Sequence, residues 1–132
     1  MTVLSFVGLG RGKLDGQLSY PRGLCLMSDG RHVAVADTEN GRVSIFSVDG
    51  EFIRHVGVGV LRGPRSIACS TVDELVVVAD SDNSRVAVFS ASRDLIATSP
   101  VDRACVGVVV YGSTMFALSG RSQCVVFTWS TW

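Results

Sequence analysis

The stretch His32–Phe46, HVAVADTENGRVSIF, has a second copy at Leu75–Phe89, LVVVADSDNSRVAVF. Each copy is an apolar run, a polar segment with Asp, Asn and Arg at the same spacing, and a second apolar run that ends in Phe. The copies are offset by 43 residues without a gap, as from Asp37 to Asp80. A repeat of this length is typical of proteins that stack copies of one supersecondary unit.

The first period contains four short apolar segments, which the turn sequences SDG, DTENG and DGE separate. No stretch shows a sustained 3.6-residue period, so the chain is predicted to be all-β. The runs LVVVA and CVGVVVY do not alternate, which indicates strands buried on both faces. Such strands are typical of propeller blades packed between two others. In the first period the expected strands are Gly23–Met27, His32–Ala36, Val43–Val48 and Phe52–Val58.

The segment Tyr20–Gly57 resembles an NHL repeat. The matching features are Pro-x-Gly, an apolar strand, Asp-Gly, VADT, Asn-x-Arg, an apolar-x-Phe strand and a closing Gly. The second copy is similar, with Ser66 in place of the first Gly, and a third copy in Cys105–Phe127 keeps the apolar strands but lacks the Asp and the Asn. The resemblance covers about Leu4 to Phe127 and implies a β-propeller of NHL-type four-stranded blades.

We predict a single domain over residues 1–132 that forms half of a propeller. Residues 1–20 would supply a closing outer strand and a linker, residues 21–63 the first blade, residues 64–101 the second, and residues 102–132 a degenerate third blade of three strands. Closed propellers have about four to eight blades. We therefore expect a second chain to complete a six-bladed homodimer with exchanged closing strands, with Trp129 and Trp132 at a seam. The alternative is that the chain is a fragment of a longer protein that supplies the other blades.

The repeated polar residues are predicted to staple a loop in each blade: Asp37, Asn40 and Arg42 in the first, and Asp80, Asn83 and Arg85 in the second. The Asp side chain can accept hydrogen bonds from turn amides. The Arg begins the returning strand opposite that Asp and can bind its carboxylate through two donors. The Asn tolerates a left-handed backbone. Because the whole set occurs twice, a structural role is favoured over a ligand site.

Binding residues are expected on the rim that carries these loops. Arg22 and Arg65 lie at the start of the innermost strands, close to the expected central channel. A cluster of arginines there could attract a phosphate or an acidic peptide, and the alternative is that each pairs with a neighbouring carboxylate. The candidate binding residues are Tyr20, Arg22, Arg62 and Arg65.

The NHL resemblance most often implies a non-catalytic scaffold that binds protein partners. The first alternative is RNA binding, which some NHL propellers perform, although the net charge is zero and only Tyr20 of the two tyrosines is placed on the rim. The second alternative is a lactonase-like or lyase-like enzyme. The amidating lyase of this family uses metal-binding histidines, and this chain has only two histidines. We therefore expect no enzyme activity, no catalytic residue, no metal and no cofactor.

The four cysteines are Cys25, Cys69, Cys105 and Cys124, and none forms a C-x-x-C pair. Their apolar neighbours predict buried reduced thiols, with a disulfide or a metal cluster as alternatives. The positive charges follow the apolar N-terminal stretch, so no secretory signal is expected, and no apolar run approaches the roughly 20 residues of a membrane-spanning helix. Together these features favour a cytosolic or nuclear setting, and we predict a cytoplasmic protein without membrane contact.

Overall fold

The computed structural model describes residues 10–71, 74–90, 92, 94–102, 104–120 and 123–128. These residues form eleven strands in three antiparallel sheets and two short 3-10 turns. None of the described residues belongs to a helix long and apolar enough to cross a lipid bilayer. The predicted all-β arc of three propeller sheets is confirmed. Most of the predicted closing strand, in residues 1–9, and both terminal tryptophans, Trp129 and Trp132, lie outside the described residues.

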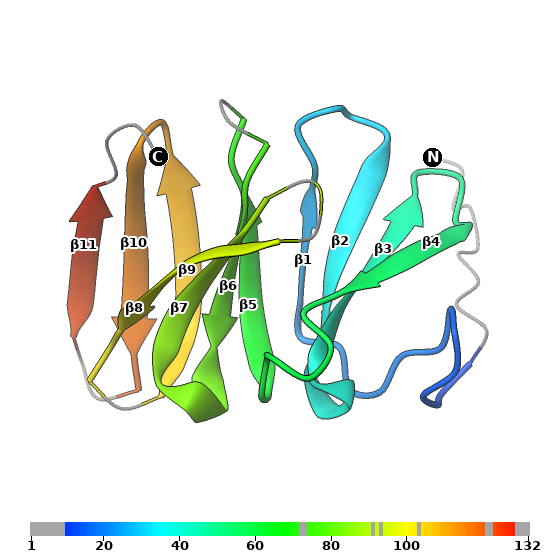
Figure 1. The fold of residues 1–132 in the computed structure, drawn as a ribbon, viewed down its shortest axis with the longest axis horizontal. Helices are drawn as coiled ribbons and strands as arrows, with labels where there is room; N and C mark the ends of the chain where they lie inside the picture. Colours follow the sequence, from blue (N-terminus) through cyan, green and yellow to red (C-terminus); the bar gives the residue numbers. More distant parts are fainter. Residues whose placement is uncertain are drawn as a thin grey trace, which may run out of the picture.

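The three sheets lie side by side, and each connects strands that are consecutive in the sequence (Figure 1). Sheet 1 contains β1 (Gly23–Leu26), β2 (His32–Asp37), β3 (Arg42–Ser47) and β4 (Phe52–Val56). Sheet 2 contains β5 (Pro64–Cys69), β6 (Val76–Asp80), β7 (Arg85–Phe89) and β8 (Leu95–Pro100). Sheet 3 contains β9 (Cys105–Tyr111), β10 (Thr114–Ser119) and β11 (Cys124–Thr128) among the described residues. The 3-10 turns η1 (Thr38–Asn40) and η2 (Ser81–Asn83) follow β2 and β6.

Apolar side chains fill the space between neighbouring sheets. In β1 to β3, every second residue points toward sheet 2, and these residues pack against the near face of β5 to β7. Residues of the opposite parity in sheet 2 pack against sheet 3. The strand β6 is buried along its whole length, as its continuous apolar sequence predicts. The fold therefore has two cores, one in each gap between sheets.

The two outer faces of the arc are open and apolar. The prediction that β9 is buried on both faces is wrong for this chain, because Val109 is 62% exposed and Tyr111 is 83% exposed. No described sheet covers that side. We call it the C-face; it consists of Val109, Tyr111, Phe116, Leu118 and Val126. The matching outer side of sheet 1, the N-face, consists of the exposed Leu24, Leu26 and Val48 and the half-buried Val33 and Val35. Phe46 lies on the same side of the sheet but is only 2% exposed.

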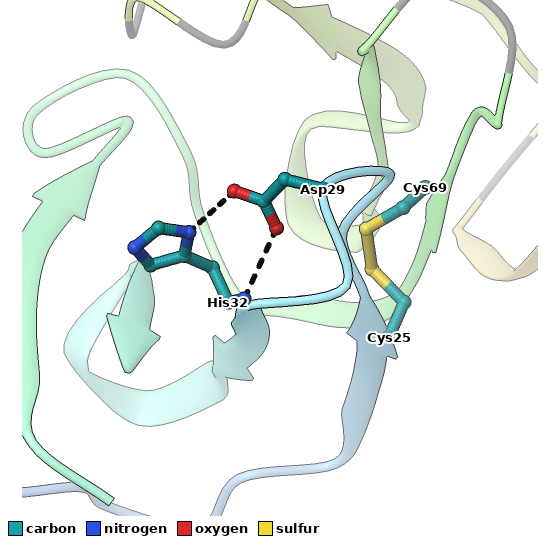
Figure 2. The surroundings of a disulfide bond; sticks show 4 residues. All are labelled: Cys25, Asp29, His32 and Cys69. Carbon is teal, nitrogen blue, oxygen red and sulfur yellow. Dashed lines mark hydrogen bonds and ion pairs between the residues drawn. A yellow bond between two sulfur atoms is a disulfide. The ribbon is translucent and has the colours of Figure 1, made fainter. Parts of the chain in front are cut away.

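A disulfide joins the innermost strands of sheets 1 and 2, from Cys25 in β1 to Cys69 in β5 (Figure 2). The prediction of reduced thiols is therefore wrong for this pair, whereas Cys105 is free and buried and Cys124 is free and exposed. The two bonded cysteines are 44 residues apart, one more than the repeat offset. Since successive strand residues point to opposite faces, this extra residue directs both thiols into the same gap. The predicted reduced thiols were one reason to expect a cytoplasmic setting, and the disulfide removes that reason.

Candidate functional site

The loop after the second strand has the same conformation in sheets 1 and 2. Asp37 and Asp80 end β2 and β6, and each is fully buried. The left-handed residue in each loop is Gly41 or Ser84, with φ of 61° and 49°. The sequence assigned that conformation to the Asn one position earlier, but this Asn lies in the 3-10 turn and contributes through its side chain.

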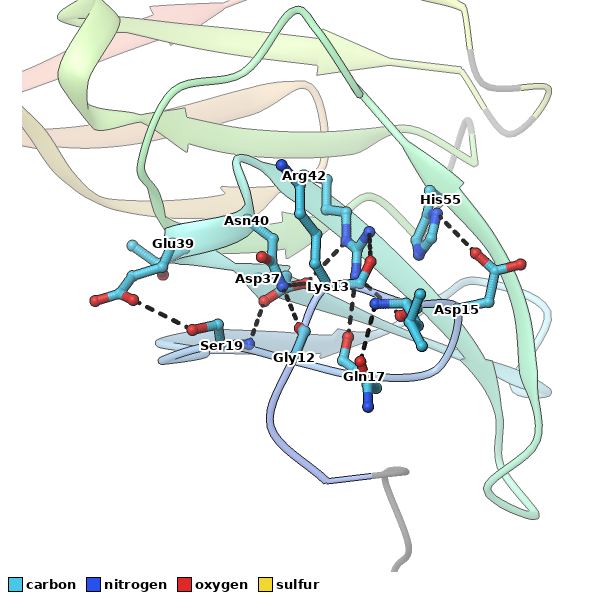
Figure 3. Close-up of polar contacts among 12 residues, drawn as sticks. Gly12, Lys13, Asp15, Gln17, Ser19, Asp37, Glu39, Asn40, Arg42 and His55 are labelled. Carbon is cyan, nitrogen blue, oxygen red and sulfur yellow. Dashed lines mark hydrogen bonds and ion pairs between the residues drawn. The ribbon is translucent and has the colours of Figure 1, made fainter.

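Asp37 binds three donors from three parts of the chain (Figure 3). Its Oδ1 accepts from the backbone N–H of Ser19 at 2.7 Å. Its Oδ2 accepts from Nε of Arg42 at 2.9 Å and from Nδ2 of Asn40 at 2.9 Å. Arg42 therefore uses one donor on the carboxylate rather than the predicted two. The buried carboxylate is paired with the positively charged Arg42 and accepts hydrogen bonds on both oxygens. A buried charge is tolerated under these conditions.

The remaining donors of Arg42 hold the segment that leads into sheet 1. Its Nη1 donates to the carbonyl of Lys13 at 2.9 Å, and its Nη2 donates to the carbonyls of Leu14 and Gln17 at 3.3 and 3.1 Å (Figure 3). Asn40 donates to the carbonyl of Gly12 at 2.8 Å. The sequence pattern gave no signal for these carbonyl partners, because any residue type can supply a backbone oxygen.

Asp80 makes the equivalent cluster one sheet further on. Its Oδ1 accepts from the backbone N–H of Arg62 at 2.7 Å, and its Oδ2 accepts from Asn83 and from Nε of Arg85 at 2.8 and 2.7 Å. Asn83 and Arg85 also donate to the carbonyl of Val60 at 3.2 and 3.0 Å. In both sheets the set anchors the linker to its loop, so these six residues are occupied by structural contacts.

A pocket of about 430 Å³ lies on this rim between sheets 1 and 2. Three of the four predicted binding residues, Arg22, Arg62 and Arg65, line it. None of their guanidinium groups makes a hydrogen bond or an ion pair within the described part of the chain. We call this site the rim pocket; its other lining residues are Thr38, Glu39, Asn40, Gly41, Leu61, Gly63 and Asp82.

The backbone around the rim pocket is fixed by the repeat. Thr38 Oγ1 donates to the carbonyl of Pro64 at 2.6 Å, which ties η1 to the start of β5. The backbone N–H of Asp82 donates to the carbonyl of Arg62 at 3.0 Å. Gly63 has φ of +58°, and a Cβ there would collide with the Asp82 carboxylate. A rigid frame therefore presents the exposed arginines, and the exposed carboxylates of Glu39 and Asp82 offset part of their charge.

Tyr20, the fourth predicted binding residue, does not line the rim pocket. It lies in a separate cavity of about 370 Å³ with Gly10, Arg11, Leu18 and Pro21. Its side chain is 51% exposed, and the guanidinium of Arg11 lies 4.9 Å from its ring centroid. The structure therefore separates the aromatic candidate from the three arginines.

Each histidine lies next to one carboxylate. His32 Nδ1 contacts the carboxylate of Asp29 in the turn before β2 (Figure 2). The pKa of Asp29 is lowered, first by the hydrogen bond from the backbone N–H of Arg31 and second by the His32 side chain. His55 Nδ1 lies 3.7 Å from Asp15 Oδ1 (Figure 3). Burial lowers the pKa of His55, and Arg42 lowers it further. Among the described residues no three His, Cys, Asp or Glu side chains are grouped to hold a metal ion.

Comparison with known proteins identifies the repeats and the architecture. The NHL repeat family matches residues 18–46 and 61–89. The RING finger protein nhl-1 of Caenorhabditis elegans is 47% identical over 47 residues, which are 36% of this chain and 5% of that protein. The chain thus spans only a small part of this relative's length.

Two solved structures have a similar fold at low sequence identity. Hydrazine synthase of Kuenenia stuttgartiensis has a TM-score of 0.75 at 16% identity, covering 94% of this chain and 36% of that one. A chain of the nidogen/laminin complex has a TM-score of 0.76 at 14% identity, covering 89% of this chain and 46% of that one. At such identities the similarity concerns the fold alone.

Proposed function

The chain contains two NHL repeats in a β-propeller fold, and from this premise we propose that it is a non-catalytic protein-interaction module that binds an anionic segment of a protein partner in the rim pocket. The observation that carries the proposal is the contrast between two sets of arginines. Arg42 and Arg85 are occupied by their loop carboxylates. Arg22, Arg62 and Arg65 line one pocket, and their guanidinium groups have no partner among the described residues.

The chemistry of the rim pocket favours carboxylate groups on an extended peptide. A guanidinium presents several N–H donors in a planar fork that matches a carboxylate. Three such groups on a rigid rim would attract an anionic partner and orient it, while Glu39 and Asp82 would oppose a partner that places negative charge directly against them. Glu39 is held in place by Ser19 Oγ at 3.2 Å. The pocket therefore favours a partner whose acidic residues contact the three arginines and do not lie against Glu39 or Asp82.

The similar proteins support this proposal at the level of the fold. The C. elegans relative is named as a RING finger protein, and one structural neighbour was solved as part of a complex between two proteins. Neither histidine lines the rim pocket, so the candidate site has no histidine to act as a general base.

Charge reversal at the rim pocket tests the proposal. The probe is a fluorescein-labelled short peptide of alternating Glu and Ser, with an all-Ser peptide as its neutral counterpart. We expect Arg22→Glu and Arg65→Glu each to weaken binding of the acidic peptide by at least about tenfold, which is the loss of one charge-assisted contact. Arg31→Glu is the matched control, because Arg31 is exposed at the opposite end of β2. Equal affinity of wild type and both rim variants would contradict the proposal.

RNA binding is a second candidate because of the exposed ring of Tyr20. Single-stranded RNA binds where aromatic rings stack on bases beside positive charge, and Tyr20 is next to Arg11 and two residues from Arg22. The same titration with labelled single-stranded RNA separates the two functions. Binding that Tyr20→Ala weakens and that exceeds binding of the acidic peptide would favour RNA over a protein partner.

A further inference from the structure

The N-face repeats a surface that is buried elsewhere in the same chain. Leu24, Val33 and Val35 occupy the positions of Ile67, Val76 and Val78 one repeat later. The sheet 2 residues are 6%, 3% and 0% exposed because they pack against sheet 1. Leu24 is 71% exposed, since no described sheet lies on its side. The N-face is therefore built as one half of an inter-sheet interface.

The C-face is the complementary half. Phe116 is paired with Val109 and Val126 across sheet 3, as Val77 is paired with Ala68 and Val88 across sheet 2. The sheet 2 residues are packed in the core against sheet 3. Each sheet thus offers one face to its predecessor and the other to its successor, and at each end of the arc one such face is not covered by a described sheet.

The sizes of the side chains on the two open faces also match. On the C-face, Phe116 and Leu118 replace Val77 and Ala79 of sheet 2, so this face is bulkier than its counterpart. The N-face contains an apolar cavity of about 270 Å³, lined by Leu24, Val33, Val35, Phe46, Ser47 and Val48. Protein interfaces pack to the density of protein interiors, so a face with extra volume fits a face with a cavity.

The existing gaps between sheets show how the two faces would meet. In the chain, β5 lies against β1 and β2, and β9 lies against β5 and β6, so the first strand of one sheet packs on the first two strands of the sheet before it. By the same rule β10 of one copy would lie on β1 of another, where Leu24 borders the cavity. The bulky residues of β10 are then placed at the hollow of the N-face.

We propose that two copies of this chain form one ring of six sheets, with the N-face of each copy packed on the C-face of the other. Each copy supplies three sheets, and rings of six lie within the usual range for propellers. The two-fold rotation closes the ring, so both seams form and no apolar face remains in water. This inference does not depend on the rim pocket, which lies within a single copy.

Solution mass and two charge variants test the ring. We expect the 132-residue chain to have twice its 14.0 kDa mass by light scattering. Phe116→Glu on the C-face and Leu26→Glu on the N-face should each give monomers, while Leu14→Glu, at a 73% exposed site on neither face, should stay dimeric. A mixture of the two monomeric variants should regain dimers, because one seam then combines two intact faces. Any of three results would overturn the proposal: a wild-type monomer, an open polymer, or a dimer that Phe116→Glu does not affect. A wild-type monomer would mean that the two faces are left for further sheets of a longer chain.

The native disulfide supplies a second test that does not rely on disruption. Cys25 faces sheet 2 from β1, and Cys69 faces sheet 1 from β5, with their Cα atoms 6.0 Å apart. The equivalent positions at the seam are Val109 on the C-face and Leu26 on the N-face. The double variant Leu26→Cys and Val109→Cys should form a covalent dimer under oxidation. The control is Leu26→Cys with Val126→Cys, because Val126 lies on the C-face like Val109 but in β11. Equal cross-linking of the two double variants would contradict the proposed register.

Discussion

At the residue scale, the repeated polar set holds the loops by saturating one buried carboxylate. Asp80 has no exposed surface and accepts hydrogen bonds on both oxygens. Its partner Arg85 is 26% exposed, so solvent screens part of the ion pair. The stabilisation therefore comes chiefly from hydrogen bonds that would be left unsatisfied if the carboxylate were removed.

Asp80→Ala should lower the free energy of unfolding by about 1–3 kcal/mol, because it leaves the donors of Arg62, Asn83 and Arg85 without their acceptor. Urea unfolding followed by circular dichroism measures the change. Asp82→Ala is the control, since Asp82 is an exposed carboxylate in the same loop and should change stability by less than about 0.5 kcal/mol. Equal effects of the two substitutions would show that the buried carboxylate is not the source of the stability.

The sequence predicted the partners within each loop but not those outside it. Asp, Asn and Arg recur at fixed spacing, and a hairpin must bring the strand ends together, so the contact of Asp37 with Arg42 follows from the pattern. The backbone donors Ser19 and Arg62 have no sequence signal, because every residue except proline carries an N–H group. The separation of Tyr20 from the arginines likewise depends on how the linker turns, with φ of 48° at Tyr20.

His55 should make the protein less stable as the pH falls below its unfolded-state pKa of about 6.5. Burial and then Arg42 lower the pKa of His55 in the folded state, and Asp15 and Asp37 only partly oppose this. The unfolded state therefore binds the proton more readily than the folded state. The contribution of His55 to the free energy of unfolding is fully present above the unfolded-state pKa and is lost as the pH falls below it. Its Nε2 is buried and has no hydrogen-bond partner among the described residues.

Urea unfolding at about pH 7.5 and pH 5.5 measures this dependence, since the two values bracket the unfolded-state pKa of histidine. His55→Gln should reduce the difference in unfolding free energy between the two pH values, because the glutamine does not titrate. His32→Gln is the matched control at the other histidine. A pH dependence that is unchanged in His55→Gln, or lost only in His32→Gln, would contradict the assignment.

At the scale of elements, the order of strands was predictable and the covalent link between sheets was not. Turn sequences and apolar runs placed the four strands of sheet 1 to within about two residues. The disulfide depends on which face each cysteine occupies, and each cysteine is unremarkable within its own strand. The alternation of faces along β1 and β5 brings Cys25 and Cys69 together across the gap.

The disulfide between Cys25 and Cys69 should stabilise the contact of sheets 1 and 2. It closes a loop with a sequence separation of 44, for which the chain-entropy estimate is about 3–4 kcal/mol. Reduction with a thiol should therefore lower the melting temperature of the wild type. The variant Cys25→Ala with Cys69→Ala should melt at the lower temperature with or without reductant. An equal effect of reductant on this variant and on the wild type would contradict the role of this bond.

At the scale of the whole molecule, the repeat specifies one kind of interface and the chain uses it twice internally. The cores on either side of sheet 2 are complete, because β6 is covered on both faces. The outer faces of sheets 1 and 3 carry the same kind of apolar residues, and no described sheet covers them. The non-alternating sequence of β9 predicted a second cover for that strand, and no described sheet supplies it.

If two copies close the ring, stability must depend on protein concentration. Unfolding then releases two chains from one assembly, so each tenfold dilution lowers the free energy that favours the dimer by about 1.4 kcal/mol. We expect the melting temperature of the wild type to fall steadily with dilution over about two decades, whereas Phe116→Glu, which breaks the C-face, should melt at one lower temperature throughout. Scanning calorimetry at high concentration and circular dichroism at low concentration cover this range. A melting temperature that is independent of concentration in the wild type would mean that the three sheets are stable with both apolar faces in water.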